Sequence, residues 1–253
     1  MGELERSKPI GLDRIVRLAW MEHAAALVAR GGDDASIEAH LLDYLQPYFP
    51  SSDPTRRGSL SKTKTILLRT WARPPESLVV FRNRGLDLLG ELPKQSHIAI
   101  HWGMLMAVYP FWREVADHVG RLIRLQGSLT SRQVQQRLRE SYGERETVSR
   151  RVRYLLRSYI DWGVLADSKK PGEYLPGLEL SIHDLATIEW MLEAYLRSKD
   201  STSAQLDDIK RSPSFFPFKY EADLTNHLAM RARHLELLSL GSGQLVVALV
   251  TGS

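Results

Sequence analysis

The chain has 253 residues, of which 43% are hydrophobic, and its formal net charge is +4. This apolar fraction is enough for a buried core and excludes wholesale disorder. The chain contains no cysteine, which excludes disulfides, thiolate catalysis and cysteine zinc sites. So small a net charge indicates a nucleic-acid partner only if the basic residues are clustered, and their distribution therefore decides the argument.

The apolar segments predict a soluble, cytoplasmic protein that has no membrane association. The first residues, MGELERSKPIGLDR, are too charged for a signal peptide. The longest strongly apolar stretch, from Ile98 to Trp112, contains His101 and Pro110 and is too short for a bilayer. The absence of cysteine is consistent with a reducing compartment.

Helical spacing of apolar residues dominates the first half of the chain. It predicts four helices, at about 12–29, 35–44, 60–71 and 76–89. We assign residues 1–97 to a helical N-terminal domain. Residues 98–127 are mostly apolar and predict a linking helix with a kink at Pro110.

Residues 128–180 predict a winged helix-turn-helix. Thr130 is a candidate N-cap for a first helix, and GERE makes a turn before a second helix that begins near Thr147. That helix ends at Gly163, a residue that favours helix C-termini. The short strands VLA and YLP then flank DSKKPGE, in which Pro171 and Gly172 provide the turn.

Residues 181–253 echo this order and predict a second module that resembles a winged helix. We expect a helix over about 182–197, an aromatic loop SFFPF, a last helix over about 222–240, and a strand QLVVALV. The predicted fold class is therefore mainly α: a helical bundle, a winged helix-turn-helix, and this weaker second copy.

The helix from Thr147 carries the clearest functional pattern. Its apolar residues, at helical spacing, are Val148, Val152, Leu155, Leu156 and Tyr159. The residues left for the exposed face are Ser149, Arg150, Arg151, Arg153, Tyr154 and Arg157. A helix fits the major groove of DNA, and arginine pairs with guanine or phosphate. Lys169 and Lys170, in the turn of the hairpin, are placed to contact the adjacent backbone.

Positive charge is concentrated in this region. From Arg121 to Gly163 there are ten arginines and four acids, an excess of +6 that is larger than that of the whole chain. A second basic run, from Arg56 to Arg73, contains no acid. Its candidate contacts are Arg56, Arg57, Lys62 and Lys64. Ser59 or Ser61 could cap a helix there, leaving free amides near its start that favour phosphate.

Three segments together resemble the BrxA family, small accessory proteins of the BREX phage-defence systems. They are SLSKTKTILLRTWARP, TVSRRVRYLLRSYIDWGVL and SFFPF, followed by a final helix. The middle segment also resembles winged-helix regulators in general. The resemblance to BrxA implies a non-enzymatic protein that binds double-stranded DNA beside a methyltransferase and other defence proteins.

Other interpretations of the basic segments remain open at this stage. The arginines could form ordinary surface ion pairs on a solvated helix face. A winged helix can also serve a transcriptional regulator, or a docking adaptor that does not touch DNA, because fold alone does not determine function.

The sequence indicates no enzyme, metal or cofactor. It has no phosphate loop of the GKT or GKS type, and GSGQL precedes a strand. His97 and His101 have the spacing of a metal pair, but no HExxH motif or nearby carboxylate accompanies them, so we interpret them as packed side chains. We interpret the aromatic residues of SFFPF as a loop inserted into the core.

Overall fold

The computed structural model describes residues 11–50, 55–143, 146–220, 224–230, 232–241 and 243–250. These residues form eleven α-helices and eight short strands in three small sheets, which confirms the mainly helical fold. Within these ranges, no helix combines the length and the apolar character that crossing a bilayer requires.

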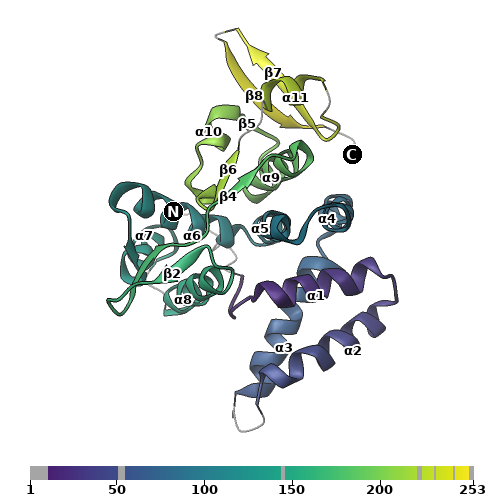
Figure 1. Cartoon of the computed structure of the whole chain (residues 1–253), viewed down its shortest axis with the longest axis vertical. Helices are drawn as coiled ribbons and strands as arrows, with labels where there is room; N and C mark the ends of the chain where they lie inside the picture. Colours follow the sequence, from purple (N-terminus) through teal and green to yellow (C-terminus); the bar gives the residue numbers. More distant parts are fainter. Residues whose placement is uncertain are drawn as a thin grey trace, which may run out of the picture.

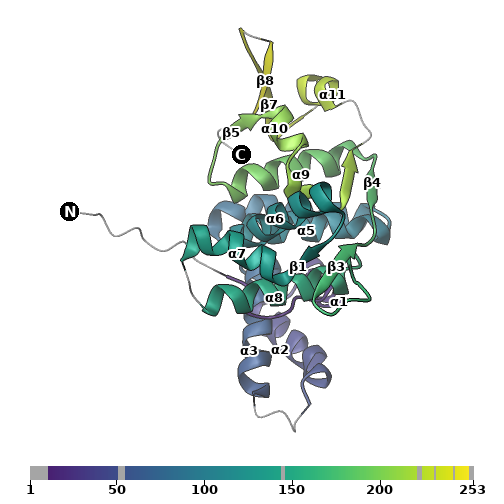
Figure 2. The ribbon, with the colours of Figure 1, turned by 90° about the vertical axis from the view of Figure 1, so that its left-hand side faces the viewer.

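The N-terminal helices are α1 (Leu18–Ala29), α2 (Asp34–Leu45), α3 (Arg56–Leu67) and α4 (Val79–Glu91). Among them, α2 and α3 reach one end of the molecule, and the hairpin of β7 (Leu235–Leu240) and β8 (Gln244–Leu249) forms the other (Figures 1 and 2). The Asp33 carboxylate accepts a hydrogen bond from the Ser36 N–H at 2.8 Å and so caps α2. A five-residue π-helical turn, Leu68–Ala72, continues α3.

The first helix begins at Leu18 and not near Leu12 as predicted. The preceding residues run along α8 (Glu146–Asp161), and two buried hydrogen bonds use the backbone of Val16. Its N–H donates to the Ser158 hydroxyl, and its carbonyl accepts from the Trp162 indole, both at 2.9 Å. These tertiary bonds replace the helical bonds that the periodicity indicated.

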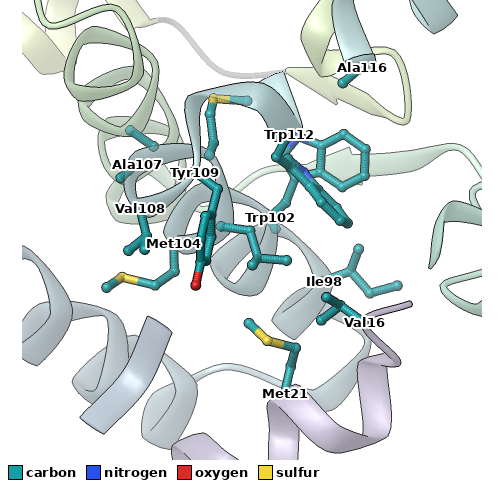
Figure 3. Packing of buried hydrophobic residues seen from close by; sticks show 14 of the residues in the cluster. Val16, Met21, Ile98, Trp102, Met104, Ala107, Val108, Tyr109, Trp112 and Ala116 are labelled. Atoms are coloured by element: carbon teal, nitrogen blue, oxygen red, sulfur yellow. The ribbon is translucent and has the colours of Figure 1, made fainter. Parts of the chain in front are cut away.

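The predicted linking helix is two helices, α5 (His97–Val108) and α6 (Pro110–Gln126). They separate at Tyr109, because Pro110 lacks an N–H and occupies the first turn of α6. Every residue of α5 is buried. Figure 3 shows Trp102 of α5 close to Trp112 of α6, with Val16 and Met21 in the same core.

Two glycines allow another tryptophan, Trp190, to enter this core. Trp190 lies on α9 (Leu185–Ser198) and stacks on Phe81 with ring centroids 3.6 Å apart. A side-chain carbon on Gly85 or Gly103 would lie 2.6 or 2.5 Å from the Trp190 indole. Glycine at these positions therefore lets α4 and α5 approach α9 closely.

The first of two similar units follows α6. It consists of β1 (Leu129–Thr130), α7 (Ser131–Tyr142), α8, β2 (Leu165–Asp167) and β3 (Glu173–Pro176). The strands pair antiparallel in the order β1-β3-β2. Thr130 and Gln133 form a capping box at the start of α7, which confirms the predicted N-cap. Gly163 follows α8 with a φ of 73°, and the two strands of the predicted hairpin are present.

The second unit repeats this order with its own strands. After α9 come β5 (Ser203–Gln205), α10 (Leu206–Lys210), α11 (Leu224–Met230), β7 (Leu235–Leu240) and β8 (Gln244–Leu249). The sheet order is β5-β8-β7. In both units, therefore, the third strand lies between the first and the second. Two further strands, β4 (Leu180–Ile182) and β6 (Phe218–Tyr220), pair parallel to each other.

The predicted last helix is wrong beyond Met230. Residues 235–240 form β7, which pairs antiparallel with β8 and joins it through the turn between Leu240 and Gln244. The pattern LELLSL is compatible with either a helix or a strand, and pairing with the apolar β8 decides it. The aromatic loop is confirmed as part of the core, because Phe215 and Phe218 are 3% and 7% exposed.

Candidate nucleic-acid interface

The core-facing side of α8 agrees with the sequence. All five residues of the predicted stripe are 0% exposed: Val148, Val152, Leu155, Leu156 and Tyr159. The Tyr159 hydroxyl donates a hydrogen bond to the Trp112 carbonyl at 2.9 Å, which fixes α8 against α6. The opposite side of the helix therefore faces solvent.

The predicted contact residues of α8 divide into three groups. Arg150, Arg153 and Arg157 are exposed, and Arg151 and Tyr154 are half-buried. Ser149 is 7% exposed, and its hydroxyl accepts a hydrogen bond from Arg139 of α7 at 3.1 Å. Ser149 therefore lies below the surface and holds a further arginine, one that the sequence analysis did not select.

Two of the exposed arginines have acidic partners. Arg150 lies 3.3 Å from Glu146 one turn earlier, and Arg157 lies 3.0 Å from Asp167 on β2. In each pair the side chains are more than half exposed. Exposed pairs of this kind contribute only about 0–1 kcal/mol, so an incoming phosphate can replace the carboxylate.

The hairpin between β2 and β3 presents both predicted lysines to solvent. Lys169 and Lys170 are exposed in the turn. The Lys170 N–H donates to the Ser168 hydroxyl at 2.9 Å, and that hydroxyl in turn donates to Glu173 at 2.7 Å. The hydrogen bond from Ser168 lowers the pKa of Glu173 and links the turn to β3.

The two basic segments meet at one hollow of about 330 Å³, which we call the basic hollow. One wall comes from the start of α3, another from the start of α8, and the third from the segment before α1. The lining residues are Asp13, Arg14, Thr55, Ser59, Lys62, Thr147, Arg150, Arg151 and Tyr154. Segments almost 100 residues apart in sequence thus share a single polar surface.

Positive charge prevails in the basic hollow. Four of its lining residues are cationic and one, Asp13, is acidic. Lys62 pairs with Asp13 at 2.8 Å, and the Arg14 guanidinium lies over the Tyr154 ring at 5.8 Å from its centroid. Two helices also begin here, and the free amides of a helix N-terminus favour anions. The arrangement suits a phosphate group.

Lys64 does not belong to the basic hollow. Residues two apart in a helix lie on opposite sides, so Lys64 faces α2 where Lys62 faces the hollow. Lys64 lies 2.6 Å from Glu38, which also accepts a bond from Arg73 at 2.9 Å. These two bonds lower the pKa of Glu38. Arg57 is exposed, and the side chain of Arg56 lies outside the described residues.

The sequence analysis missed four residues that line the basic hollow: Asp13, Arg14, Thr55 and Thr147. No pattern in the sequence marks Asp13 and Arg14, because only the tertiary fold brings them to α8. Thr147 had a signal, since it lies in the first turn of a predicted basic helix.

Comparison with family models, with curated proteins and with solved structures gives no match to this chain. The function must therefore be argued from the geometry of the interface itself.

Proposed function

We propose that this protein binds double-stranded DNA through the basic hollow and the arginine-bearing face of α8, and that it catalyses no reaction. The observation that carries the proposal is the meeting of Lys62 with Arg150 and Arg151 around one hollow at which two helices begin. A structural role for these cations would not require them to converge from two separate basic segments.

We also propose that the first unit is a winged helix-turn-helix. The order α6-β1-α7-α8-β2-β3 and the sheet order β1-β3-β2 support this assignment. In such a module the second helix of the pair enters the major groove, which assigns that role to α8. The turn that carries Lys169 and Lys170 is then the wing, and it contacts the neighbouring phosphates.

The chemistry of the contacts favours DNA backbone over base sequence. Arg150, Arg151 and Lys62 surround a hollow whose size and charge suit phosphate, and phosphate contacts carry no sequence information. We therefore expect weak sequence preference and an affinity of roughly 1 to 100 micromolar at physiological salt.

A protein-docking adaptor is the second candidate. The pairs that Arg150 and Arg157 form with acidic neighbours favour it, because a helix face with satisfied charges needs no nucleic acid. The resemblance to the BrxA family suggests a further role beside phage-defence proteins. Co-purification of such proteins with the intact chain would test that role separately.

The direct test is a titration of the full chain with a labelled duplex of mixed sequence, followed by fluorescence anisotropy at several salt concentrations. We expect binding at about 50 millimolar salt that weakens linearly on a log–log plot as salt rises. Absence of binding to any duplex at that salt concentration would contradict the proposal and favour the adaptor. Neither DNA cleavage nor nucleotide hydrolysis should accompany binding.

A further inference from the structure

Three potential metal ligands converge between α1 and α5. Glu22 lies on α1, and His97 and His101 lie four residues apart on one face of α5. The Glu22 Oε1 atom is 2.8 Å from His97 Nδ1 and 3.2 Å from His101 Nε2. One potential ligand atom from each of the three residues lies within 4.8 Å of the other two. The carboxylate that the sequence motif lacked thus comes from a distant helix.

The hydrogen bonding of His97 indicates a cation at this point. Its Nε2 lies 3.1 Å from the Leu92 carbonyl oxygen, which can only accept, so Nε2 carries the hydrogen. In a neutral ring Nδ1 then carries a lone pair and no hydrogen. This nitrogen lies 2.8 Å from the Glu22 carboxylate oxygen. Two acceptors this close repel each other unless a proton or a metal ion lies between them.

His101 supplies an independent observation. Its side chain is 0% exposed, and within the described part of the chain neither ring nitrogen makes a hydrogen bond of good geometry, although Nε2 lies 3.2 Å from the Glu22 carboxylate. Leaving such a group unpartnered in the core is costly, whereas a metal bond would satisfy the nitrogen that faces Glu22. A proton shared by His97 and Glu22 would not satisfy it.

We propose that Glu22, His97 and His101 bind one divalent transition-metal ion, of which zinc fits the donor set best. Two imidazoles and one carboxylate are a zinc ligand set, with donor bonds of about 2.0–2.2 Å. Donors around a tetrahedral ion of that size lie about 3.3 Å apart, so the observed 2.8 and 3.2 Å require shifts of a few tenths of an ångström.

The surroundings provide access and a fourth position. A cavity of about 330 Å³ between α1 and α4 is lined by Glu22 and His97, and by small residues such as Ala25, Ala26 and Gly90. Glu22 is 34% exposed, whereas His101 is 0% exposed and does not line the cavity. Water or a small ligand in the cavity can complete the coordination. The bound ion would join the N-terminal helices to the central helix α5.

The test uses the full chain without any histidine tag, stripped with a chelator and then supplied with Zn²⁺ alone. After gel filtration, elemental analysis should find one zinc ion per chain, and the melting temperature should rise with free Zn²⁺. The single variants Glu22→Gln and His97→Gln should each weaken zinc binding by at least about 10-fold. Losing a residue that only hydrogen-bonds to a metal ligand already costs about that much affinity. The matched control, His40→Gln, changes an exposed histidine on α2 and should leave zinc binding unchanged.

Cobalt substitution gives a readout that needs no variant. Co²⁺ in place of zinc should produce visible absorption typical of nitrogen and oxygen ligands. It should also quench tryptophan fluorescence, because Trp71 packs edge-on against His101 with ring centroids 5.3 Å apart. Zinc lost completely on gel filtration together with a featureless Co²⁺ spectrum would overturn the proposal. Equal zinc retention by Glu22→Gln and the unaltered chain would overturn it as well.

Discussion

The two βααββ units share a strand order but differ in the charges they carry. In the first unit α8 presents Arg150, Arg153 and Arg157 to solvent, and its hairpin turn contains two lysines. In the second, α11 has the sequence LTNHLAM with no charged residue, and the sequence has no lysine or arginine between Leu240 and Gln244. His227 of α11 is directed at the buried Glu189 of α9, at 3.4 Å.

This difference separates what topology provides from what residues provide. The same succession of elements builds a cationic helix face in one unit and an uncharged helix, with His227 directed at buried Glu189, in the other. Architecture alone therefore does not indicate a DNA contact, and the argument depends on the side chains of α8 and α3. The comparison predicts that changes in the first unit alter DNA affinity while equivalent changes in the second do not.

The largest expected effect comes from the buried side of α8. Val152→Asp places an unpaired charge at a site that is 0% exposed and should cost at least about 4 kcal/mol of unfolding free energy. Arg153→Asp at the neighbouring exposed position is the matched control and should change stability by no more than about 0.5 kcal/mol. Urea unfolding of both variants measures the difference. Similar losses of unfolding free energy in the two variants would mean that Val152 does not face the core.

The two hairpin turns provide the next comparison. Lys169→Ala with Lys170→Ala should reduce the log–log salt slope of DNA binding by up to about 1.8, because each lost phosphate contact removes about 0.9. Gly241→Lys instead adds a cation to the second turn, where a side chain meets nothing within 4 Å. It should add no affinity. If Gly241→Lys raised DNA affinity as much as the double lysine variant lowers it, both units would contact DNA.

The smallest expected effects distinguish two lysines of α3. Lys62→Ala removes one cation of the basic hollow, so the salt slope should fall by about 0.9 with stability nearly unchanged. Lys64→Ala breaks its pair with Glu38 and should cost at most about 1 kcal/mol of stability while leaving DNA affinity unaltered. Anisotropy titrations and thermal unfolding of both variants test this division. DNA affinity that depends on Lys64 and not on Lys62 would contradict the placement of the hollow.

Long amphipathic segments were predictable from the sequence, and four of the short strands were not. The stripe of α8 and the cap at Thr130 were correct, because a sixteen-residue helix and a capping box leave local patterns. The strands β1, β4, β5 and β6 have two or three residues each, too few for any periodicity. Residues 235–240 were predicted as helix and form a strand for a different reason. Their pattern fits both structures, and only pairing with β8 distinguishes the two.

The candidate sites show the same division between local and distant information. The arginines of α8 and the acid-free run in α3 could be selected from composition alone. That Lys62 faces α8 while Lys64 faces α2 depends on how the helices pack. Glu22 lies 75 residues before His97, so no spacing rule could join it to the two histidines.

The most direct test of the central claim is the salt dependence of duplex binding by the double variant Arg150→Ala, Arg153→Ala. The two residues are exposed and three positions apart on α8, so their removal should leave folding intact. If both contact phosphates, affinity should fall for every duplex and the log–log slope should shrink by roughly 1.8. If they contact guanines, discrimination between sequences should fall by roughly 1 to 3 kcal/mol per lost pair. Wild-type affinity, slope and sequence preference in this variant would mean that α8 does not face DNA, and would contradict the account.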